Sequence, residues 1–332
     1  MFSFIRKLQR VGLIGINRRN LDYIATQNSR KDLHLVDDKL VTKARATALG
    51  IDVPELYGLV QTPRQARDFR TIADAKQSFV IKPVRGSGGN GILVVDKVRG
   101  DKYFRSDGTY LSFQQIEHHI HNILSGVYSL SGLTDQAMIE YRVKPSTLFD
   151  EWSFSGVPDI RVVLYKGVPA MAMLRLPTRE SGGRANLHQG AVGVGINLTD
   201  GVTTNGIYHD APVDEHPDYG TPLAGLALPN WNELLSLAAR CQKIANLGYM
   251  GVDIVIDQQF GPLVLELNAR PGLAIQLANR TGLAHILNNI DQAGFIKPAT
   301  IKLLRGKTAQ QPFTAQYAAT EDDVKDRYQA TI

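Results

Sequence analysis

The chain has 332 residues, which is enough for one large domain or for two or three lobes around a substantial core. Hydrophobic residues make up 43% and charged residues 21%, and no apolar run approaches the roughly 18 residues that a membrane-spanning helix needs. The N-terminus lacks the features of a secretory signal peptide, and the single cysteine, Cys241, excludes an internal disulfide and a multi-cysteine metal site. These properties predict a cytoplasmic protein.

The net charge of +5 comes from the N-terminus. Residues 1–20 contain no acid, the remainder of the chain is formally neutral, and the basic residues are Arg6, Lys7, Arg10, Arg18 and Arg19. A nucleic-acid-binding protein usually carries a basic face on its folded domain, so we expect no nucleic-acid partner. The segment is either a solvated helix end or a peripheral contact for an acidic membrane surface or partner, with apolar contacts from Phe2, Phe4, Ile5 and Leu8.

The predicted elements alternate helices with hairpins. After a short helical lead-in over 1–35, helices are expected over 36–50, 63–76, 112–125 and 230–247. Strands are expected over 56–61, on both sides of a glycine loop within 78–95, and over 136–143, 160–166, 169–176, 251–257 and 262–267. Hairpins rather than repeated βαβ units predict a mixed α+β fold and disfavour a doubly wound parallel sheet. Cys241 lies on the apolar face of its helix and is expected to be an inert core residue.

Lys82 ends an apolar strand and stands beside the glycine-rich sequence RGSGGNG over residues 85–91. Such a backbone can approach a ligand closely and turn its N–H groups toward an anion, and the lysine adds the positive charge that a polyphosphate needs. The pattern is not a Walker A motif, because the lysine precedes the glycines, and it is not a dinucleotide fingerprint, because a strand follows the loop. A flexible hairpin tip is the alternative interpretation.

A second group of polar residues lies on two strands near the C-terminal end. Glu266 and Asn268 are two residues apart and therefore point to the same side of their strand, and Asp253 lies on the preceding strand across a short turn. Two carboxylates and an amide oxygen are hard ligands that suit a Mg²⁺ ion also bound to phosphate oxygens. Burying them among apolar neighbours without a cation would be costly, although a solvated hairpin face is the alternative.

From Asp38 to about Leu283 the chain resembles the ATP-grasp superfamily, and within it the α-L-glutamate ligase-like proteins. The likeness lies in six ordered motifs: DDKLVTKARATALGIDVPE, VIKPVRGSGGNGI, MIEYRV, DIRVVLYKG, GGRANLHQGA, and GYMGVDIVID with GPLVLELNARPGL. The resemblance implies an α+β ATP-grasp fold in which two α+β lobes hold ATP between them. It also implies ATP and Mg²⁺, or Mn²⁺ in its place, as cofactors.

The resemblance assigns roles to individual residues. Lys39 and Lys82 would contact the phosphates, with Lys43 as the competing candidate for the first position. The remaining nucleotide contacts would come from the glycine loop, the adenine hinge, the ribose carboxylate and the segment near the γ-phosphate, that is, from Gly86, Ser87, Gly88, Gly89 and Gly91, from Glu140, Tyr141, Arg142 and Val143, from Asp159, and from Arg184, Ala185 and Asn186. The magnesium ligands would be Asp253, Glu266 and Asn268. Arg184, Asn186 and Arg270 would act on the reacting groups, while Arg161 and His188 have equally plain structural interpretations.

The expected domain division is a short basic segment over 1–37, an ATP-grasp domain over 38–305 and a polar tail over 306–332. The small lobe would span about 60–140 and the large lobe about 141–305. Members of the superfamily typically carry a further domain before the Asp-Lys motif, and here that region is reduced. Another subunit or a partner protein would then complete the substrate site. Gly251 also stands where dipeptide-forming relatives carry an arginine, so Arg184 or Arg270 would have to replace it.

The function that the resemblance implies is ATP-dependent carboxylate–amine ligation through an acyl phosphate, with glutamate or a similar acidic amino acid or peptide as substrate. The basic side chain of Arg270 suits an acidic substrate, because arginine binds carboxylates in a bidentate manner. An ATP-grasp kinase that stops at phosphoryl transfer and an inactive nucleotide-binding module are the two alternatives.

Overall fold

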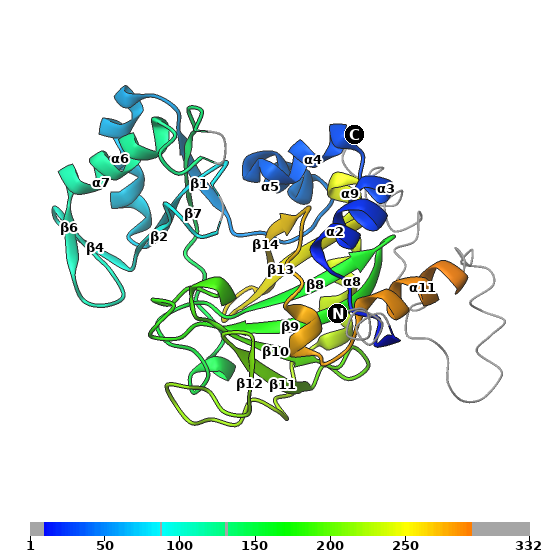
Figure 1. The fold of residues 1–332 in the computed structure, drawn as a ribbon. Helices are drawn as coiled ribbons and strands as arrows, with labels where there is room; N and C mark the ends of the chain where they lie inside the picture. The colour runs from blue at the N-terminus through cyan, green and yellow to red at the C-terminus, as the bar shows by residue number, and fades with distance from the viewer. Residues whose placement is uncertain (1–9, 87, 130–131, 294–332) are drawn as a thin grey trace.

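The computed structural model describes residues 10–86, 88–129 and 132–293, and these form two lobes (Figure 1). Every pair of neighbouring strands in the three described sheets is antiparallel, which agrees with the predicted α+β class. Within the described ranges, no helix is long and apolar enough to cross a membrane. The basic residues Arg6 and Lys7, the glycine-loop residue Ser87 and the tail over 306–332 lie outside these ranges.

The small lobe contains a four-stranded sheet packed against two helices. The strand order is β1-β7-β2-β3, formed by Leu56–Val60, Ala137–Glu140, Phe79–Pro83 and Leu93–Val95. Helices α6 (Pro63–Lys76) and α7 (Phe113–Leu124) begin at the capping boxes of Thr62 and Ser112, in which each side chain accepts from the third backbone N–H of its helix. A three-stranded sheet extends this lobe with β4 (Lys97–Arg99), β5 (Lys102–Phe104) and β6 (Tyr110–Ser112). Phe69, Phe79 and Tyr103 join these elements in one aromatic core.

The large lobe is built on a seven-stranded sheet of order β12-β11-β10-β9-β8-β13-β14. The strands, in chain order, are β8 (Asp159–Tyr165), β9 (Val168–Leu176), β10 (Val192–Ile196), β11 (Thr203–Tyr208), β12 (Ala211–Val213), β13 (Tyr249–Asp257) and β14 (Gly261–Asn268). Short 3₁₀ turns lie before and within this series at η2 (Thr147–Phe149) and η3 (Leu187–Gln189).

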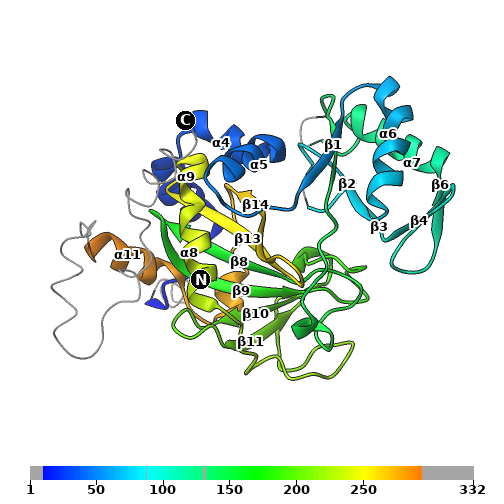
Figure 2. The same cartoon turned by 180° about the vertical axis from the view of Figure 1, so that it is seen from behind.

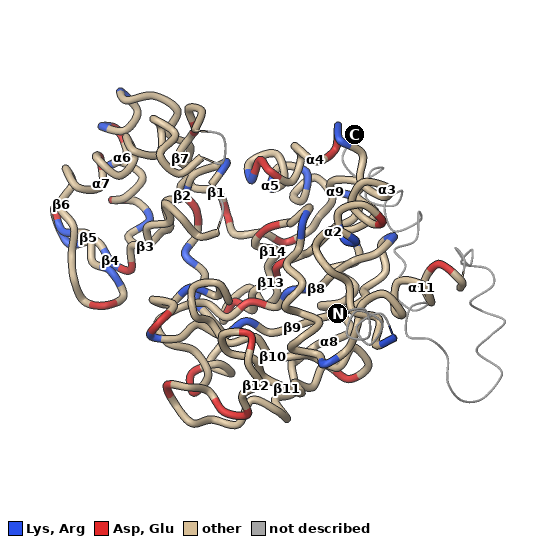
Figure 3. The backbone as a smooth tube through the Cα atoms, in the orientation of Figure 1, with Lys and Arg blue, Asp and Glu red and all other residues tan. Residues whose placement is uncertain are grey.

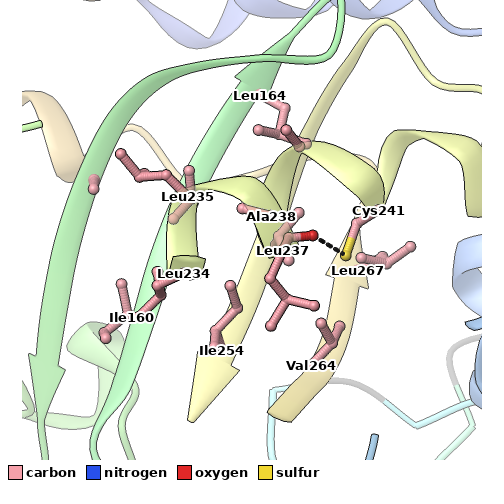
Figure 4. Packing of buried hydrophobic residues seen from close by; sticks show 14 of the residues in the cluster. Ile160, Leu164, Leu234, Leu235, Leu237, Ala238, Cys241, Ile254, Val264 and Leu267 are labelled. Atoms are coloured by element: carbon pink, nitrogen blue, oxygen red, sulfur yellow. Dashed lines mark hydrogen bonds between the residues drawn. The ribbon is translucent and has the colours of Figure 1, made fainter. Parts of the chain in front are cut away.

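Helices cover both faces of the large sheet. Seen from behind in Figure 2, α8 (Trp231–Arg240) and α9 (Gln242–Ala245) lie across one face. Figure 4 shows Leu234 and Ala238 of α8 packing against Ile160 and Ile254. The other face is covered by α10 (Ile275–Ala278), α11 (Leu283–Ala293) and the N-terminal helices α2 (Ile16–Arg18), η1 (Arg19–Ile24) and α3 (Ala25–Gln27). Helices α4 (Arg30–Asp37) and α5 (Lys39–Ala48) pack beside β14.

The N-terminal segment from residue 10 to residue 28 is part of the large lobe. Ile14, Tyr23 and Ile24 are buried against the sheet. The buried side chain of Gln276 accepts from Ile14 N at 2.9 Å and donates to Ile14 O at 3.0 Å. Asn28 makes the same two-way contact with the backbone of Tyr249, at 2.7 and 2.9 Å. These amide contacts fix the segment to the strand β13 and to α10.

Several sequence expectations differ from the structure. Strands β4, β5 and β6 lie where only a turn and the start of a helix were expected, and the helix expected over 36–50 is divided at Asp38, between α4 and α5. The helix expected over 230–247 is divided at Cys241, between α8 and α9. No strands were expected between residues 177 and 206, yet β10 and the start of β11 lie there. The prediction that Cys241 is an inert core residue is confirmed, because its thiol is fully buried and burial raises its pKa to about 12.

Candidate active site

A small pocket lies where α5, the small sheet and β14 meet, and three lysines line it: Lys39, Lys43 and Lys82. Leu265 and Glu266 of β14 and Met138 of β7 also line it. Lys39 begins α5, whose N-cap Asp38 accepts from the N–H groups of Leu40 and Val41 at 3.0 Å. Figure 3 shows basic and acidic residues gathered in this region between the two lobes.

Glu140 is the counter-charge of the pocket. Its carboxylate is 2% exposed and contacts Lys82, while Lys43 Nζ lies 3.0 Å from its Oε2. Burial alone would raise the pKa of Glu140, but the two ammonium groups outweigh burial and hold the pKa below its ordinary value. Burial lowers the pKa of Lys39 and of Lys43, against the opposing effects of Glu266 and Glu140 respectively. The three lysines outnumber the two glutamates, Glu140 and Glu266, so these five side chains carry one formal positive charge.

The glycine loop joins this pocket to the segment over 184–189 of the large lobe. Lys39 Nζ donates to Gly86 O, which places the first predicted phosphate lysine on the loop. Asn186 Nδ2 and Gln189 Nε2 both donate to Gly88 O at 3.4 Å. Gly88, Gly89 and Gly91 adopt positive φ values of 64°, 79° and 76°, the left-handed conformation that glycine tolerates best. The structure therefore brings together two segments that the motifs identify about a hundred residues apart.

The three predicted magnesium ligands share one face of the β13–β14 hairpin. Asp253 is directly opposite Glu266 in the strand register, and Asn268 is opposite Gly251. Directly opposed residues have Cβ atoms about 5 Å apart, so the side chains of Asp253 and Glu266 are neighbours on this face. Among the described residues there is no group of three or more His, Cys, Asp or Glu side chains arranged to hold a metal. The set therefore offers two carboxylates and an amide, which fit a hard cation whose other ligands are phosphate oxygens.

Asp253 also belongs to a buried ionic network on β8, β9 and β13. Arg161 donates to both of its oxygens at 2.7 and 2.5 Å, and Arg175 Nη2 donates to Oδ2 at 2.6 Å. The guanidinium of Arg175 also binds both oxygens of Asp159, at 2.5 Å each. Burial raises the pKa of Asp159, whereas for Asp253 the two arginines outweigh burial and lower the pKa.

This network bears on three predicted roles. Both oxygens of Asp253, a predicted magnesium ligand, accept from arginines, so its assignment to the metal stays a prediction that needs at least one of these contacts to open. Both oxygens of Asp159, the predicted ribose ligand, bind Arg175, so the assignment to ribose likewise stays a prediction that needs this pair to open. Arg161 has the structural ion pair that was its plainer interpretation. Arg175 was not identified from sequence, although an arginine inside the apolar run AMAMLRL is a signal, because an isolated buried charge requires a partner.

The predicted adenine hinge follows β7 and crosses to the large lobe. Tyr141 N donates to Glu55 O at 2.8 Å, and its hydroxyl donates to Asp257 Oδ2 at 3.1 Å. Burial and this hydrogen bond raise the pKa of Tyr141 to about 12. Arg142 pairs with Asp96 at 2.8 Å, and Val143 is buried against Val255 and Leu263. The hinge therefore links the small lobe to β13.

The residues predicted to act on the reacting groups lie on exposed loops. Arg184 is exposed and Ala185 is half-buried. Asn186 Oδ1 accepts from His188 N at 3.0 Å, which starts η3. Arg270 is exposed, and its backbone N–H donates to Asn268 Oδ1 at 3.1 Å. Arg184 thus lies beside the glycine loop, where its Cδ is 3.6 Å from the position of a Cβ on Gly89, and Arg270 lies on the turn after the hairpin.

Comparisons with known proteins give a family and a set of similar folds. The model of the family described as sugar-transfer associated ATP-grasp matches residues 18–292. No curated protein matches the chain.

Similar solved structures include the ATP-grasp ligase PsnB complexed with its minimal precursor, with 15% identity and a TM-score of 0.43 over 80% of this chain and 62% of that one. D-alanine–D-alanine ligase from Bacillus anthracis has 14% identity and a TM-score of 0.45, over 84% and 72%. A RimK domain protein ATP-grasp from Sphaerobacter thermophilus has 14% identity and a TM-score of 0.41, over 77% and 67%. The chain spans about three fifths of the length of PsnB.

Proposed function

The chain belongs to the sugar-transfer associated ATP-grasp family, and from this premise we propose that it is an ATP-dependent carboxylate–amine ligase. Membership of the ATP-grasp superfamily, which the six sequence motifs predict, is thereby confirmed. The observation that carries the proposed activity is that side chains of both charge types line one pocket. Lys39, Lys82 and Glu266 all line it, and Glu266 is opposite Asp253 in the hairpin register. Cations for a polyphosphate and hard oxygen ligands for its metal are the two requirements of phosphoryl transfer.

In the proposed mechanism, ATP lies between the lobes with its phosphates under the glycine loop and against Lys39 and Lys82. Asp253, Glu266 and Asn268 would hold Mg²⁺, which when bound supplies charge neutralisation at the phosphates. The substrate carboxylate attacks the γ-phosphorus, ADP leaves, and an acyl phosphate forms. An amine nitrogen then attacks the acyl carbon, loses a proton, and inorganic phosphate departs as the amide bond closes. Arg184 is proposed to stabilise the oxyanion of that tetrahedral intermediate, with Asn186 holding the loop.

We infer an acidic amino acid such as glutamate as the carboxylate substrate. Arg270 supports this inference, because it is exposed on the turn that directly follows Asn268. A guanidinium at this place favours a substrate with a second negative charge. Adenine is proposed to contact the hinge over 140–143, and the ribose is proposed to contact Asp159.

A peripheral attachment of the N-terminus, in a cytoplasmic protein, is a further part of the proposal. Residues 10–28 pack on the large lobe, but Val11, Ile16 and Leu21 leave 56, 64 and 67% of their surface exposed. Exposed apolar residues beside arginines suit an acidic membrane surface, a second subunit or a partner protein that completes the substrate site.

The test is a screen of ADP release with Mg²⁺-ATP across acids and amines. A ligase releases ADP only when both an acid and an amine are present, whereas a kinase needs no amine and an inactive module releases none. Glu266→Gln should lower kcat by more than about a hundredfold, because it removes a charge at the phosphates but little volume. Glu233→Gln, on the exposed start of α8, is the matched control. Normal turnover in Glu266→Gln with an unchanged melting curve would remove Glu266 from the mechanism.

A further inference from the structure

We infer that Arg19, on the N-terminal segment, binds the non-reacting carboxylate of the acid substrate beside the turn over residues 268–272. The inference rests on the proposed ligase function and adds a specificity-determining residue that no motif contains. It also assigns a role at the site to the segment that precedes the Asp-Lys motif.

Tyr249, Gly251 and Asp253 are alternate residues of β13 and therefore face the same side of the sheet. Tyr249 is held by Asn28 of the N-terminal segment, at 2.7 and 2.9 Å. Asp253 belongs to the candidate metal site. The N-terminal segment thus contacts the backbone of β13 four residues before Asp253, and Gly251 lies midway between the two.

Gly251 lies against the turn that follows β14. A Cβ atom built on Gly251 would lie 3.0 Å from Pro271 Cβ and 3.6 Å from Asn268 Cβ. The turn after β14 therefore occupies the position that a side chain at residue 251 would take. A cation that faces the substrate here must come from the turn itself or from a segment packed against it. Arg270 satisfies the first condition and Arg19 the second.

Arg19 contacts this turn and its own neighbour, Asn20. Its Nη1 donates to Pro271 O at 3.0 Å, so the guanidinium lies on the turn. Its Nε and Nη2 donate to Asn20 Oδ1 at 3.1 and 2.9 Å. A guanidinium carries five N–H groups, so one N–H on each terminal nitrogen is left for another acceptor. In the described part of the chain, Arg19 forms no ion pair with a carboxylate.

The backbone changes its helical form at Arg19. The N-terminal segment changes from an α-helical turn to a π-helix that begins at Arg19 and ends at Ile24. π-Helical turns are rare and often mark functional sites, because the wider turn redirects side chains. In Figure 1, α2 lies beside the end of β14, as the contact between Arg19 and Pro271 requires. Arg18, its neighbour, is exposed and pairs with Asp22 at 3.3 Å, which makes it a matched control of the same charge.

The experiment measures binding rather than turnover. The full-length chain is saturated with Mg²⁺ and a non-hydrolysable ATP analogue, and L-glutamate and L-glutamine are titrated by calorimetry. The wild type should bind L-glutamate more tightly. Arg19→Gln should raise the Kd for L-glutamate about tenfold or more and leave the Kd for L-glutamine and for the ATP analogue unchanged, since a charge-assisted hydrogen bond is lost. Arg18→Gln should change none of the three.

Several outcomes would overturn the inference. The first is an equal increase in the Kd values for L-glutamate and L-glutamine in Arg19→Gln. The second is the same change in Kd for Arg19→Gln and Arg18→Gln. The third is that the wild type binds neither amino acid. If Arg19→Gln does not fold, Arg19→Lys is tested in its place, because lysine keeps the positive charge but cannot bind a carboxylate in the bidentate manner of a guanidinium. An unchanged preference for L-glutamate in Arg19→Lys would contradict a guanidinium contact. Absence of acid- and amine-dependent ADP release from the wild type contradicts the ligase function instead, so the two failures are distinguishable.

Discussion

Lys82 lies in a pocket with two further lysines and with Glu266, and it pairs with Glu140, so lysines are in excess and the arrangement suits a polyphosphate better than a neutral ligand. We expect Lys82→Ala to raise the Kd for ATP about tenfold or more, because charge-assisted hydrogen bonds are stronger than those between neutral groups. Adenosine should bind with a nearly unchanged Kd, since its base is proposed to contact the hinge and not Lys82. Calorimetric titration of both ligands checks this, with the surface residue Lys76 replaced by alanine as control. Equal loss of the two ligands would mean that Lys82 only supports the loop.

Glu140 gives a prediction about pH. Its pKa in the folded chain lies below the ordinary value of 4.5, because Lys82 and Lys43 outweigh burial. A lowered folded-state pKa contributes stability that is complete above pH 4.5 and is lost as pH falls through the folded-state value. At neutral pH, Glu140→Gln should lower the free energy of unfolding by about 3–5 kcal/mol, because it leaves two buried lysines without a counter-charge.

The measurement is the melting temperature of wild type and Glu140→Gln from pH 7 downward. The difference between them should be largest near neutral pH and should shrink below pH 4.5, the ordinary pKa. Glu233→Gln, an exposed change on α8, should show no such trend. A constant difference for Glu140→Gln across this range would contradict the proposed ionisation.

Sequence reasoning at the residue scale found the lysines and the oxygen donors, because each lies in a motif with regular spacing. It left Lys39 and Lys43 open, since both project from one helix face. The structure separates them: Lys39 contacts the glycine loop, whereas Lys43 pairs with Glu140. The ionic partners of Arg175 lie 16 and 78 residues away, and such pairs depend on strand register that one sequence does not reveal.

At the scale of elements, the strongly patterned segments were predictable and the glycine-rich ones were not. Helix α6 begins and ends at the residues that the pattern predicts, because Thr62, Pro63 and Gln65 form a complete start signal. Strand β10 reads as a loop because two of its five residues are glycines. A Cβ on Gly195 would lie 2.5 Å from Ala278 O, so close packing of backbone requires glycine there and tertiary contacts override its low strand propensity.

The loop that carries Arg184 gives a prediction at this scale. A Cβ on Gly156 would lie 2.0 Å from Gly183 O, and a backbone atom cannot move aside cheaply. Gly156→Ala should therefore displace residues 182–186. We expect kcat for acid- and amine-dependent ADP release to fall about tenfold or more, because a displacement of about 1 Å in a catalytic group can lower the rate up to about a hundredfold. The Kd for ATP should change much less.

Gly15→Ala is the control, because a Cβ at Gly15 has no neighbour within 4 Å and the residue has a negative φ. ADP release and calorimetric ATP binding are compared for the two variants and the wild type. An unchanged kcat in Gly156→Ala would show that the loop can shift without affecting the reacting groups, and it would weaken the role proposed for Arg184.

At the scale of the whole molecule, the two lobes meet through a small number of connections. Lys39 N donates to Val84 O at 3.2 Å, and Tyr141 N donates to Glu55 O at 2.8 Å. Both contacts join the edge of the small lobe to segments that lead into the large lobe. The pocket lies between them, so a change in the relative position of the lobes would alter the separation of the lysines from Glu266. Nucleotide binding is therefore expected to be coupled to the arrangement of the lobes.

The N-terminus provides the last prediction, for which two deletions are compared. Removing residues 2–9 should leave the melting temperature and the Kd for ATP unchanged, because it keeps Ile14, Tyr23 and Ile24, which anchor the segment to the large lobe. Removing residues 2–24 also removes Ile14, Tyr23 and Ile24, which are buried in the large lobe. This longer deletion should destabilise the fold by several kcal/mol, at about 1.5–3 kcal/mol for each buried apolar side chain.

The shorter deletion then tests the peripheral attachment without damage to the fold. Each basic residue near an anionic membrane contributes about 1 kcal/mol, and the deleted residues include Arg6, Lys7 and two phenylalanines. Wild type should bind anionic liposomes at low salt and release them at high salt, whereas the deletion variant should bind weakly at both. Neutral liposomes are the control for lipid, and light scattering reports the oligomeric state of both proteins. Equal liposome binding and equal assembly of the two proteins would contradict recruitment by this segment and leave residues 10–28 with the structural and substrate-binding roles alone.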